Sequence, residues 1–211
     1  MELILASGSQ RRRELLTMCG YDYEIIVSNA DESIDESDPE KFVRALSLRK
    51  AREVFDRLSA AGKRDFAVIG SDTVVAFKKD DAAQAEIIGK PHDAADAVRI
   101  LSMLSGRTHR VFTGVSVIAD VTRENAAENP RVQTECCITE VTFEALTERE
   151  ILDYVNSGDP LDKAGSYGIQ GPFGMFVREI RGNYFNVIGM PIPALYKMLK
   201  KIGILPNGFS E

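Results

Sequence analysis

The sequence contains few cysteines and few histidines, and their scarcity argues against several kinds of site. Its three cysteines are Cys19, Cys136 and Cys137, and no C-x-x-C pair occurs. Neither a disulfide framework nor a cysteine zinc site is therefore expected. The two histidines, His92 and His109, are not spaced as metal ligands, and no serine–histidine–acid set can be recognised. Zinc-dependent and serine-hydrolase chemistry are poor fits.

Long hydrophobic runs and an excess of positive charge are also missing. No stretch approaches the roughly 20 apolar residues that cross a bilayer, and the N-terminal "LILA" is too short for the core of a signal peptide. With 26 Lys and Arg against 32 Asp and Glu, the net charge is −6, which argues against a general nucleic-acid binder. We expect a cytoplasmic protein that binds neither nucleic acid nor membrane. A bound anion would have to meet a local positive cluster.

The hydrophobic pattern alternates between strand-like and helix-like periods, which predicts an α/β protein in one domain over residues 1–211. Strands are expected at 2–7, 21–29 and 66–77, with a polar-tipped hairpin in 66–91 and a second hairpin from 110–121 to 131–146 that is joined by a polar loop. A strand pair is expected around 182–191. The hairpins indicate a mixed sheet. Helices are expected from Ser9 to Gly20 and at 39–58, 93–104, 147–158 and 192–203. Asp38 is expected to cap the second of these helices, and Thr147 and Glu150 are expected to form a capping box at the start of the fourth.

The first candidate site is the strand–turn–helix stretch "LASGSQRRREL". Its small-residue turn, 7–9, offers backbone N–H groups at the positive end of a helix. Arg11, Arg12 and Arg13 follow, and guanidinium groups match phosphate oxygens in geometry. The pattern is not a P-loop, because the G-x-x-x-x-G-K-[ST] spacing is absent. The alternative is a solvated helix face on which the arginines pair with nearby carboxylates.

The second candidate is Asp72, in the "GSDTVV" segment of an otherwise apolar strand. A buried carboxylate is unfavourable unless it is paired or bound to a metal. At the end of a strand it could bind a divalent cation or activate water. The alternative is a structural aspartate that caps a turn. Glu32, in the acidic loop 30–38, is a weaker signal, since such a loop is usually solvated.

Three isolated lysines, Lys50, Lys90 and Lys163, form a third set, although each could be an ordinary surface lysine. The small residues around Tyr167 and Gln170 in "DKAGSYGIQG" suit a loop that wraps closely around a ligand. Taken with the arginines and carboxylates, these cations suggest a triphosphate pocket with a metal ion.

These motifs occur in the same order as in the Maf family of nucleoside triphosphate pyrophosphatases, which the chain resembles. The matching stretches are "LASGSQRRRELL", "ADES", "LSLRKAREVF", "GSDTVV", "GKP", "LSGRTHRVFTGV", "DKAGSYGIQG" and "GNYFNVIGMP". The resemblance implies an α/β fold with a twisted mixed sheet flanked by helices, and two lobes around a deep cleft, similar to inosine triphosphate pyrophosphatases. It also implies hydrolysis between the α- and β-phosphates with a divalent metal, Mg²⁺ or Mn²⁺, and a possible homodimer.

The resemblance also implies roles for individual residues. Asp72 corresponds to the catalytic aspartate, as general base or metal-side activator, and Glu32 joins it as a metal ligand. The phosphate and substrate contacts correspond to Ser7, Arg11, Lys50 and Lys90. The selectivity positions of the dTTP and UTP branch correspond to Arg12, Thr73 and Gln170. Gln10 stands where the family usually has proline, which leaves the start of the helix less constrained.

The resemblance implies hydrolysis of dTTP and UTP as nucleotide-pool housekeeping, and it leaves open whether modified pyrimidine triphosphates are also substrates. Three alternatives remain open. One is a pyrophosphatase for damaged purine triphosphates, and another is a nucleotide-sensing regulator of cell division. The third is an α/β domain whose basic cluster is only a solvated face.

Overall fold

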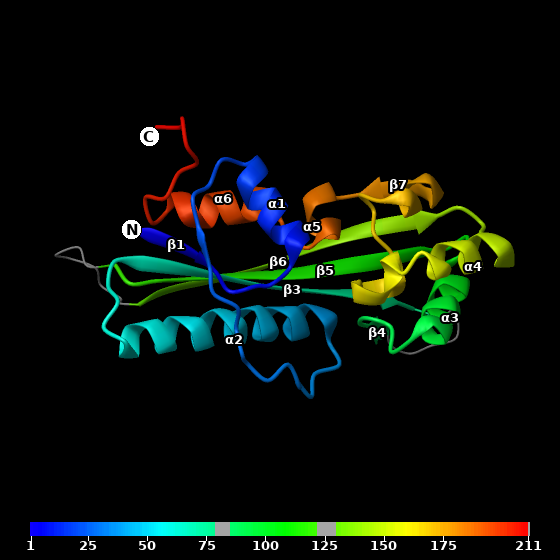
Figure 1. Ribbon diagram of the computed structural model, residues 1–211, viewed down its shortest axis with the longest axis horizontal. Helices are drawn as coiled ribbons and strands as arrows, with labels where there is room; N and C mark the ends of the chain where they lie inside the picture. Colours follow the sequence, from blue (N-terminus) through cyan, green and yellow to red (C-terminus); the bar gives the residue numbers. More distant parts are fainter. Residues whose placement is uncertain (79–84, 122–129, 211) are drawn as a thin grey trace. The chain divides into compact units, whose positions relative to one another are not determined.

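The computed structural model describes residues 1–78, 85–121 and 130–210 and contains a seven-stranded mixed sheet flanked by helices (Figure 1). The strands are β1 (Glu2–Leu5), β2 (Glu24–Ile25), β3 (Phe66–Phe77), β4 (Glu86–Ile88), β5 (Thr108–Ala119), β6 (Arg131–Phe143) and β7 (Val177–Arg181). The α-helices are α1 (Gln10–Met18), α2 (Pro39–Ala60), α3 (Ala94–Leu104), α4 (Glu148–Asn156), α5 (Tyr184–Ile188) and α6 (Ile192–Lys200). Three short 3-10 helices are η1 (Asp159–Asp162), η2 (Ala164–Ser166) and η3 (Pro172–Phe176).

The sheet has the strand order β2-β1-β3-β5-β6-β7, with β4 paired to β3. Strand β1 runs parallel to both β2 and β3, whereas β4 is antiparallel to β3 and β7 is antiparallel to β6. The mixed sheet and the pairing of β3 with β4 confirm the predictions from the sequence. The expected polar tip of that hairpin and the loop before β6 fall at residues 79–84 and 122–129, outside the described residues.

The chain folds into two compact units, in agreement with the two lobes that the resemblance implied. Unit 1 consists of Met1–Asp72, Thr113–Cys137 and Gly189–Glu211, and unit 2 consists of Thr73–Phe112 and Ile138–Ile188. The long strands β3, β5 and β6 each contribute residues to both units. The single domain over 1–211 stays a prediction.

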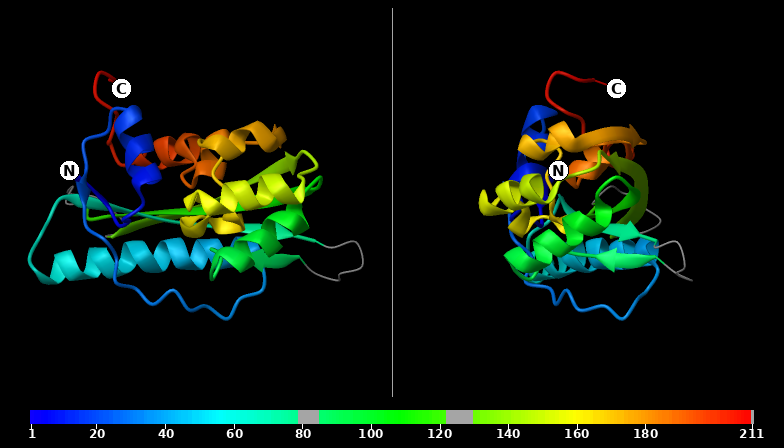
Figure 2. Two further views of the ribbon diagram at one scale, coloured as in Figure 1. Left: turned by 45° about the vertical axis from the view of Figure 1, so that its right-hand side comes forward. Right: turned by 90° about the vertical axis from the view of Figure 1, so that its right-hand side faces the viewer.

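In unit 1, helices cover both faces of the sheet. Helix α2 lies on one face, and α1 and α6 lie on the other (Figures 1 and 2). The core beside α2 includes Phe55 and Phe66, whose rings stack with centroids 5.0 Å apart. On the other face, α1 buries Leu15 and Leu16. Burial of these apolar side chains is the main stabilising contribution to such a layered unit.

Two glycines allow α2 to lie unusually close to the sheet. A Cβ atom on Gly70 of β3 would overlap the carbonyl oxygen of Ser47 and lie 2.7 Å from the backbone nitrogen of Ala51. A Cβ on Gly114 of β5 would overlap the carbonyl of Val43. The backbone of the helix therefore packs directly on the backbone of two strands, where only glycine fits. This contact fixes the height of the helix residues next to Ala51 above the sheet.

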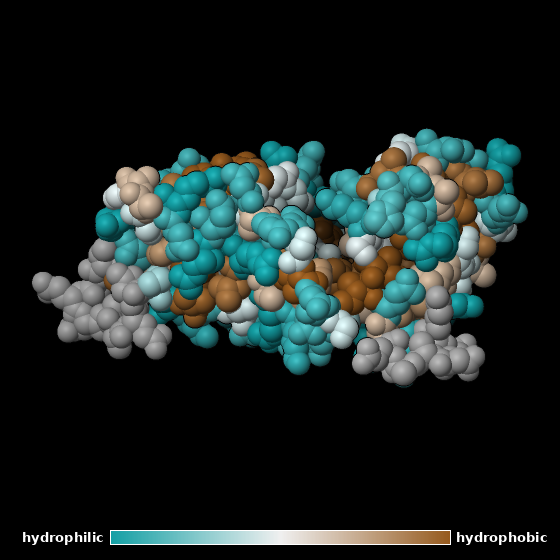
Figure 3. Space-filling view, turned by 90° about the horizontal axis from the view of Figure 1, so that it is seen from below, coloured by the Kyte–Doolittle hydropathy of each residue, from teal (hydrophilic) through white to brown (hydrophobic). Residues whose placement is uncertain are grey.

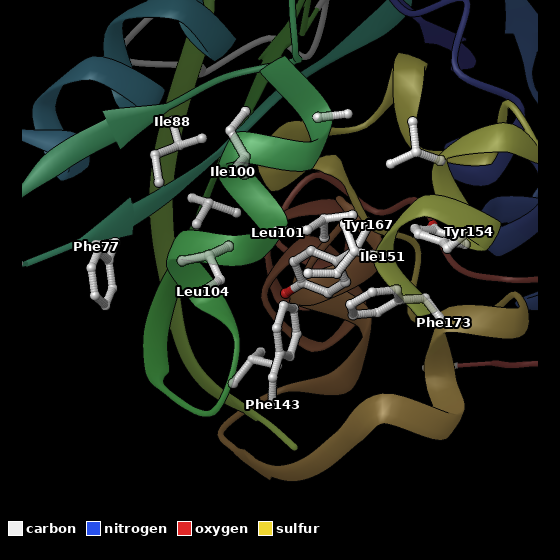
Figure 4. Packing of buried hydrophobic residues seen from close by; sticks show 14 of the residues in the cluster. Phe77, Ile88, Ile100, Leu101, Leu104, Phe143, Ile151, Tyr154, Tyr167 and Phe173 are labelled. Carbon is white, nitrogen blue, oxygen red and sulfur yellow. The ribbon is translucent and has the colours of Figure 1, made fainter. Parts of the chain in front are cut away.

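Unit 2 is built around aromatic rings and one buried histidine. The cluster includes residues from β3, β4, α3, β6, α4 and the 163–176 segment (Figure 4). The ring of Phe143 lies 4.8 Å from those of Tyr167 and Phe173, and 4.7 Å from that of His109. Edge-to-face aromatic contacts of this kind stabilise a core beyond the area they bury.

The predicted strand pair around 182–191 is wrong, because residues Tyr184–Ile188 form helix α5. The Oδ1 atom of Asn183 accepts a hydrogen bond from the backbone N–H of Asn186 at 2.9 Å, as a residue before a helix does. Gly182 and Gly189, on either side of this helix, have φ values of 131° and 115°, which do not fit a continuous strand. Strand β7 precedes this segment instead and pairs with β6.

Most of the expected helix starts are confirmed. The side chain of Asp38 accepts hydrogen bonds from the N–H groups of Glu40 and Lys41 at the start of α2. Thr147 and Glu150 form the predicted capping box of α4. Ser9 does occupy the position before α1, but its side chain makes no capping hydrogen bond.

Hydrophilic residues cover much of the face drawn in Figure 3, with smaller hydrophobic patches between them. Across residues 1–78, 85–121 and 130–210, no helix combines the length and apolar character needed to cross a bilayer.

Candidate active site

The ammonium group of Lys50 lies between two carboxylates in unit 1. Its Nζ atom is 2.9 Å from Oδ1 of Asp72 and 2.9 Å from Oε1 of Glu32. The side chains of Lys50 and Asp72 are only 11% and 13% exposed, whereas that of Glu32 is 65% exposed. The two largely buried charges compensate each other, which meets the requirement for placing a carboxylate in an apolar strand. The structure thus brings together Asp72, Lys50 and Glu32, three of the residues expected from the sequence.

The local packing explains why these residues meet. Lys50 precedes Ala51, the residue of α2 that rests on Gly70, and Asp72 lies two residues after Gly70 in β3. Glu32 belongs to the acidic loop 30–38, which is tied to α2 by Arg49. The Nη1 atom of Arg49 donates to the carbonyl oxygens of residues 31 and 33 at 2.9 and 2.8 Å. Sequence reasoning missed Arg49, since its bonds to backbone carbonyls leave no recognisable spacing.

Arg12 is held against the same region by backbone and hydroxyl groups. Its Nε donates to the carbonyl oxygen of Gly189 at 2.8 Å, and its Nη1 donates to Oγ of Ser7 at 3.1 Å. Burial lowers the pKa of the Arg12 guanidinium, Asp72 and Glu32 act in the opposite direction, and the charge of Arg11 lowers it further. The first motif and the Asp72 motif are therefore electrostatically coupled, with two arginines near two carboxylates.

Ser71 and Gly189 link three of the motifs in unit 1. The hydroxyl of Ser71 is fully buried and lies 3.0 Å from the carbonyl oxygens of both Gly114 and Gly189. The Gly189 carbonyl therefore accepts from Arg12 and lies within hydrogen-bond distance of Ser71, the residue before Asp72. Sequence reasoning missed both residues. The available signal was a polar side chain inside an apolar strand, the same signal that pointed to Asp72.

The remaining candidates lie in unit 2. Lys90 and Gln170 are exposed, and Thr73, which follows Asp72 in β3, is half-buried. The carbonyl oxygen of Gly89 accepts from the N–H of Gly165 at 3.0 Å. The "GKP" and "DKAG" motifs are therefore neighbours in this unit, as a common binding role would require.

Two other residues of the "DKAGSYGIQG" loop face the protein. The Nζ atom of Lys163 lies 3.0 Å from Oδ1 of Asp159 and 2.7 Å from Oδ1 of Asp162, and the side chain is 12% exposed. The Oη atom of Tyr167 is 2.9 Å from Nε2 of buried His109. Tyr167 is thus a core residue, and the part of the loop left at the surface is the turn that contains Gln170.

The oxygen donors in unit 1 suit a hard divalent cation only together with a ligand. Within the described part of the chain, no group of three or more His, Cys, Asp or Glu residues is arranged to hold a metal ion. Glu32 and Asp72 do converge on one cation, the ammonium of Lys50. One or two carboxylates completed by substrate phosphates is the donor set typical of protein-bound Mg²⁺.

Comparison with known proteins agrees with the motifs. The model of a family described as "Maf-like protein" matches residues 2–202. The dTTP/UTP pyrophosphatase of Bacillus thuringiensis subsp. konkukian is 45% identical over 204 residues, which cover 96% of each chain. That of Clostridium beijerinckii is 45% identical over 204 residues, covering 96% of this chain and 100% of the relative. That of Agathobacter rectalis is 41% identical over 211 residues, covering 96% and 98%.

Among solved structures, the Staphylococcus aureus Ham1 protein matches with a TM-score of 0.48 and 15% identity, covering 95% of this chain and 99% of that one. The match of the family model to nearly the whole chain, together with relatives above 40% identity, is decisive: the chain belongs to the Maf family.

Proposed function

We infer that this protein hydrolyses the pyrimidine nucleoside triphosphates dTTP and UTP to the monophosphate and pyrophosphate, as part of nucleotide-pool housekeeping. The observation on which this rests most is the placement of Lys50 between Asp72 and Glu32, in a chain closely related to dTTP/UTP pyrophosphatases. A largely buried carboxylate next to a cation cluster is the arrangement that water activation beside a polyphosphate needs.

In this reaction Asp72 acts as the general base. A water oxygen bonds to the α-phosphorus, the bond from that phosphorus to the bridging oxygen breaks, and pyrophosphate leaves with the electron pair. The proton of the water passes to the Asp72 carboxylate and then to solvent. Lys50, 2.9 Å from Asp72, fixes the orientation of the carboxylate and places a positive charge beside the phosphates.

Glu32 and Asp72 would also hold the divalent metal, Mg²⁺ or Mn²⁺. Such an ion, when bound with the triphosphate, supplies charge neutralisation at the phosphate oxygens. The metal ion and the Lys50 ammonium would both carry positive charge, and both would compensate the charge of the phosphates. Ser7, Arg11 and Lys90 are the further phosphate contacts, and a cation cluster in a chain of net charge −6 suits a polyanionic ligand.

Base selection is assigned to Arg12, Thr73 and Gln170. Thymine and uracil present two carbonyl acceptors around an N3–H donor. The amide of Gln170 supplies one donor and one acceptor and can therefore form two complementary hydrogen bonds with this edge. Cytosine reverses the pattern at N3 and C4, so an amide held in the orientation that fits uracil would leave polar groups unpaired in a CTP complex, at about 1–3 kcal/mol for each buried one.

The test is a comparison of kcat/KM for dTTP, UTP, CTP, dCTP, ATP, GTP and ITP, with Mg²⁺ or Mn²⁺ and inorganic pyrophosphatase as coupling enzyme. We expect dTTP and UTP to lead. If ITP or GTP led, the protein would be a purine pyrophosphatase. Tight binding of dTTP without turnover would identify a nucleotide sensor instead. The homodimer and the cytoplasmic location stay predictions.

A further inference from the structure

The hydroxyl of Tyr154 contacts two parts of the loop that contains Gln170. Tyr154 lies in α4 and is buried. Its Oη donates to Oδ2 of Asp159 at 2.5 Å and accepts from the backbone N–H of Gly168 at 3.1 Å. A hydroxyl has one proton and two lone pairs, so both bonds form together. Burial and the Asp159 carboxylate raise the pKa of Tyr154, which keeps the donating proton in place.

Asp159 connects Tyr154 to Lys163. Its Oδ2 accepts from Tyr154, while its Oδ1 lies 3.0 Å from Nζ of Lys163. The same Nζ atom donates to the backbone carbonyl of Asp159 at 2.5 Å. With both carboxylate oxygens engaged and the lysine largely buried, the three side chains restrain one another.

The turn with Gln170 rests directly on this set. The N–H of Gly171 donates to the carbonyl oxygen of Gly168 at 3.3 Å, which closes a turn with Gln170 as its third residue. A Cβ atom on Gly168 would lie 2.7 Å from Cε and 2.9 Å from Cδ of Lys163. The turn is therefore seated on the stem of Lys163 and bonded at its first residue to Tyr154.

We propose that Tyr154, Asp159 and Lys163 form a positioning network that fixes the 168–171 turn and thereby orients Gln170 for base selection. None of the three touches the reacting atoms in this scheme, and Lys163 serves as part of the support instead of as a phosphate ligand. The inference rests on the proposed function, because the orientation of Gln170 affects catalysis only if that residue reads the base.

The decisive variant is Tyr154→Phe, which removes one oxygen atom and leaves the ring packed against Phe173. Without the hydroxyl, the N–H of Gly168 loses its acceptor and the turn is free to reorient. We expect kcat/KM for UTP relative to CTP to fall roughly tenfold, mainly through KM for UTP, with kcat within a few-fold. Amide hydrogen exchange in residues 168–171 should be faster in the variant.

Tyr167→Phe is the matched control, because it removes the other hydroxyl of the same aromatic cluster, which contacts His109 and not the turn. It should leave the UTP-to-CTP ratio and the exchange of 168–171 close to wild type. If Tyr154→Phe did not fold, Asp159→Asn would break the same chain of contacts, with the same two readouts expected to change.

The outcomes separate this inference from the proposed function. Wild-type protein without a preference for UTP over CTP would refute the proposed function and the selectivity role together. A selective wild type whose ratio is unchanged in Tyr154→Phe would overturn only the inference. Exchange in 168–171 that is unchanged, or changed equally by Tyr167→Phe, would also overturn it.

Discussion

Each unit contains a lysine that is about one-tenth exposed and lies between two carboxylates, yet the two clusters differ in how they are built. Lys50 joins Glu32 and Asp72, which come from a loop and a strand distant in sequence. Lys163 joins Asp159 and Asp162, its neighbours within four residues. The first cluster depends on the packing of α2 against β3, whereas the second is local to one loop.

The difference indicates which cluster is suited to chemistry. The Oδ1 atom of Asp72 contacts Lys50, which also contacts Glu32, and the charges of both carboxylates act on Arg12. Several charges of both signs therefore converge there. Asp159 has both carboxylate oxygens occupied by Tyr154 and Lys163. A carboxylate that is held by hydrogen bonds on both oxygens is well suited to ordering a loop. We therefore assign catalysis to the Lys50 cluster and positioning to the Lys163 cluster.

The largest expected effect that tests this assignment comes from Asp72→Asn. The substitution keeps the shape of the side chain and removes the charge, so turnover of dTTP should fall by about 10²–10⁴-fold while the protein stays folded. Steady-state kinetics and circular dichroism measure the two properties. Asp162→Asn, at a carboxylate that also contacts a lysine, is the control and should leave kcat within a few-fold. Comparable losses in both variants would remove the distinction between the clusters.

The next largest effects are expected when Lys50 and Lys163 are each replaced by methionine, and these effects should differ between the two clusters. Lys50→Met leaves the largely buried Asp72 without its cation and removes a positive charge from the phosphate site. Binding of a non-hydrolysable dTTP analogue should weaken by about 2 kcal/mol or more, roughly thirty-fold. Lys163→Met should retain that affinity within a few-fold and lose base discrimination. Calorimetry with the dTTP and CTP analogues gives both numbers, and the reverse pattern would exchange the two roles.

The sequence predicted the parts of this comparison that depend on local chemistry. Asp38 and Thr147 were recognised as helix caps because a cap uses residues within one turn. The charge of Asp72 could also be recognised locally, because most of its strand is apolar. Family resemblance, and not periodicity, connected Asp72 with Lys50 and Glu32, since nothing local to "LRKAR" distinguishes Lys50 from a surface lysine.

Contacts between distant segments could not be predicted from the sequence pattern. The bond from Arg12 to the carbonyl of Gly189 and the bonds of Arg49 to loop carbonyls use backbone acceptors, which every residue possesses. Helix α5 was mistaken for a strand because "NYFNVI" is rich in aromatic and branched residues. The Asn183 cap and buried Asn186, whose amide donates to the carbonyl of Val111 at 3.0 Å, outweigh that propensity.

A smaller effect is expected from acid, which should act on the aromatic core next to the Lys163 cluster. Burial lowers the pKa of His109 from 6.5 to about 3. Folded protein keeps this side chain neutral, whereas unfolded chain takes up a proton below pH 6.5. The contribution of neutral His109 to the free energy of unfolding is therefore complete above about pH 6.5. It is lost as the pH falls toward 3, at about 1.4 kcal/mol per pH unit.

We predict that His109 lowers the free energy of unfolding by about 2 kcal/mol at pH 5 relative to pH 7.5. Urea denaturation at pH 7.5 and pH 5 measures it. His109→Gln, which can still pair with the Tyr167 hydroxyl, should reduce the difference between the two pH values, while His92→Gln at an exposed position should not. A pH difference that persists in full in His109→Gln would assign it to other groups.

The smallest effects concern the exposed carboxylate of each cluster, Glu32 at 65% and Asp162 at 66% exposure. Exposed ion pairs contribute between zero and about 1 kcal/mol, so Glu32→Gln and Asp162→Asn should each change the free energy of unfolding by less than that. Their metal dependence should differ, because only Glu32 is proposed as a metal ligand. Glu32→Gln should raise the Mg²⁺ concentration for half-maximal dTTP hydrolysis several-fold, and Asp162→Asn should leave it unchanged. Since the two substitutions remove the same charge at equal exposure from the same type of contact, a Mg²⁺ requirement that shifts equally in both would reflect net charge alone and would remove Glu32 from the metal site.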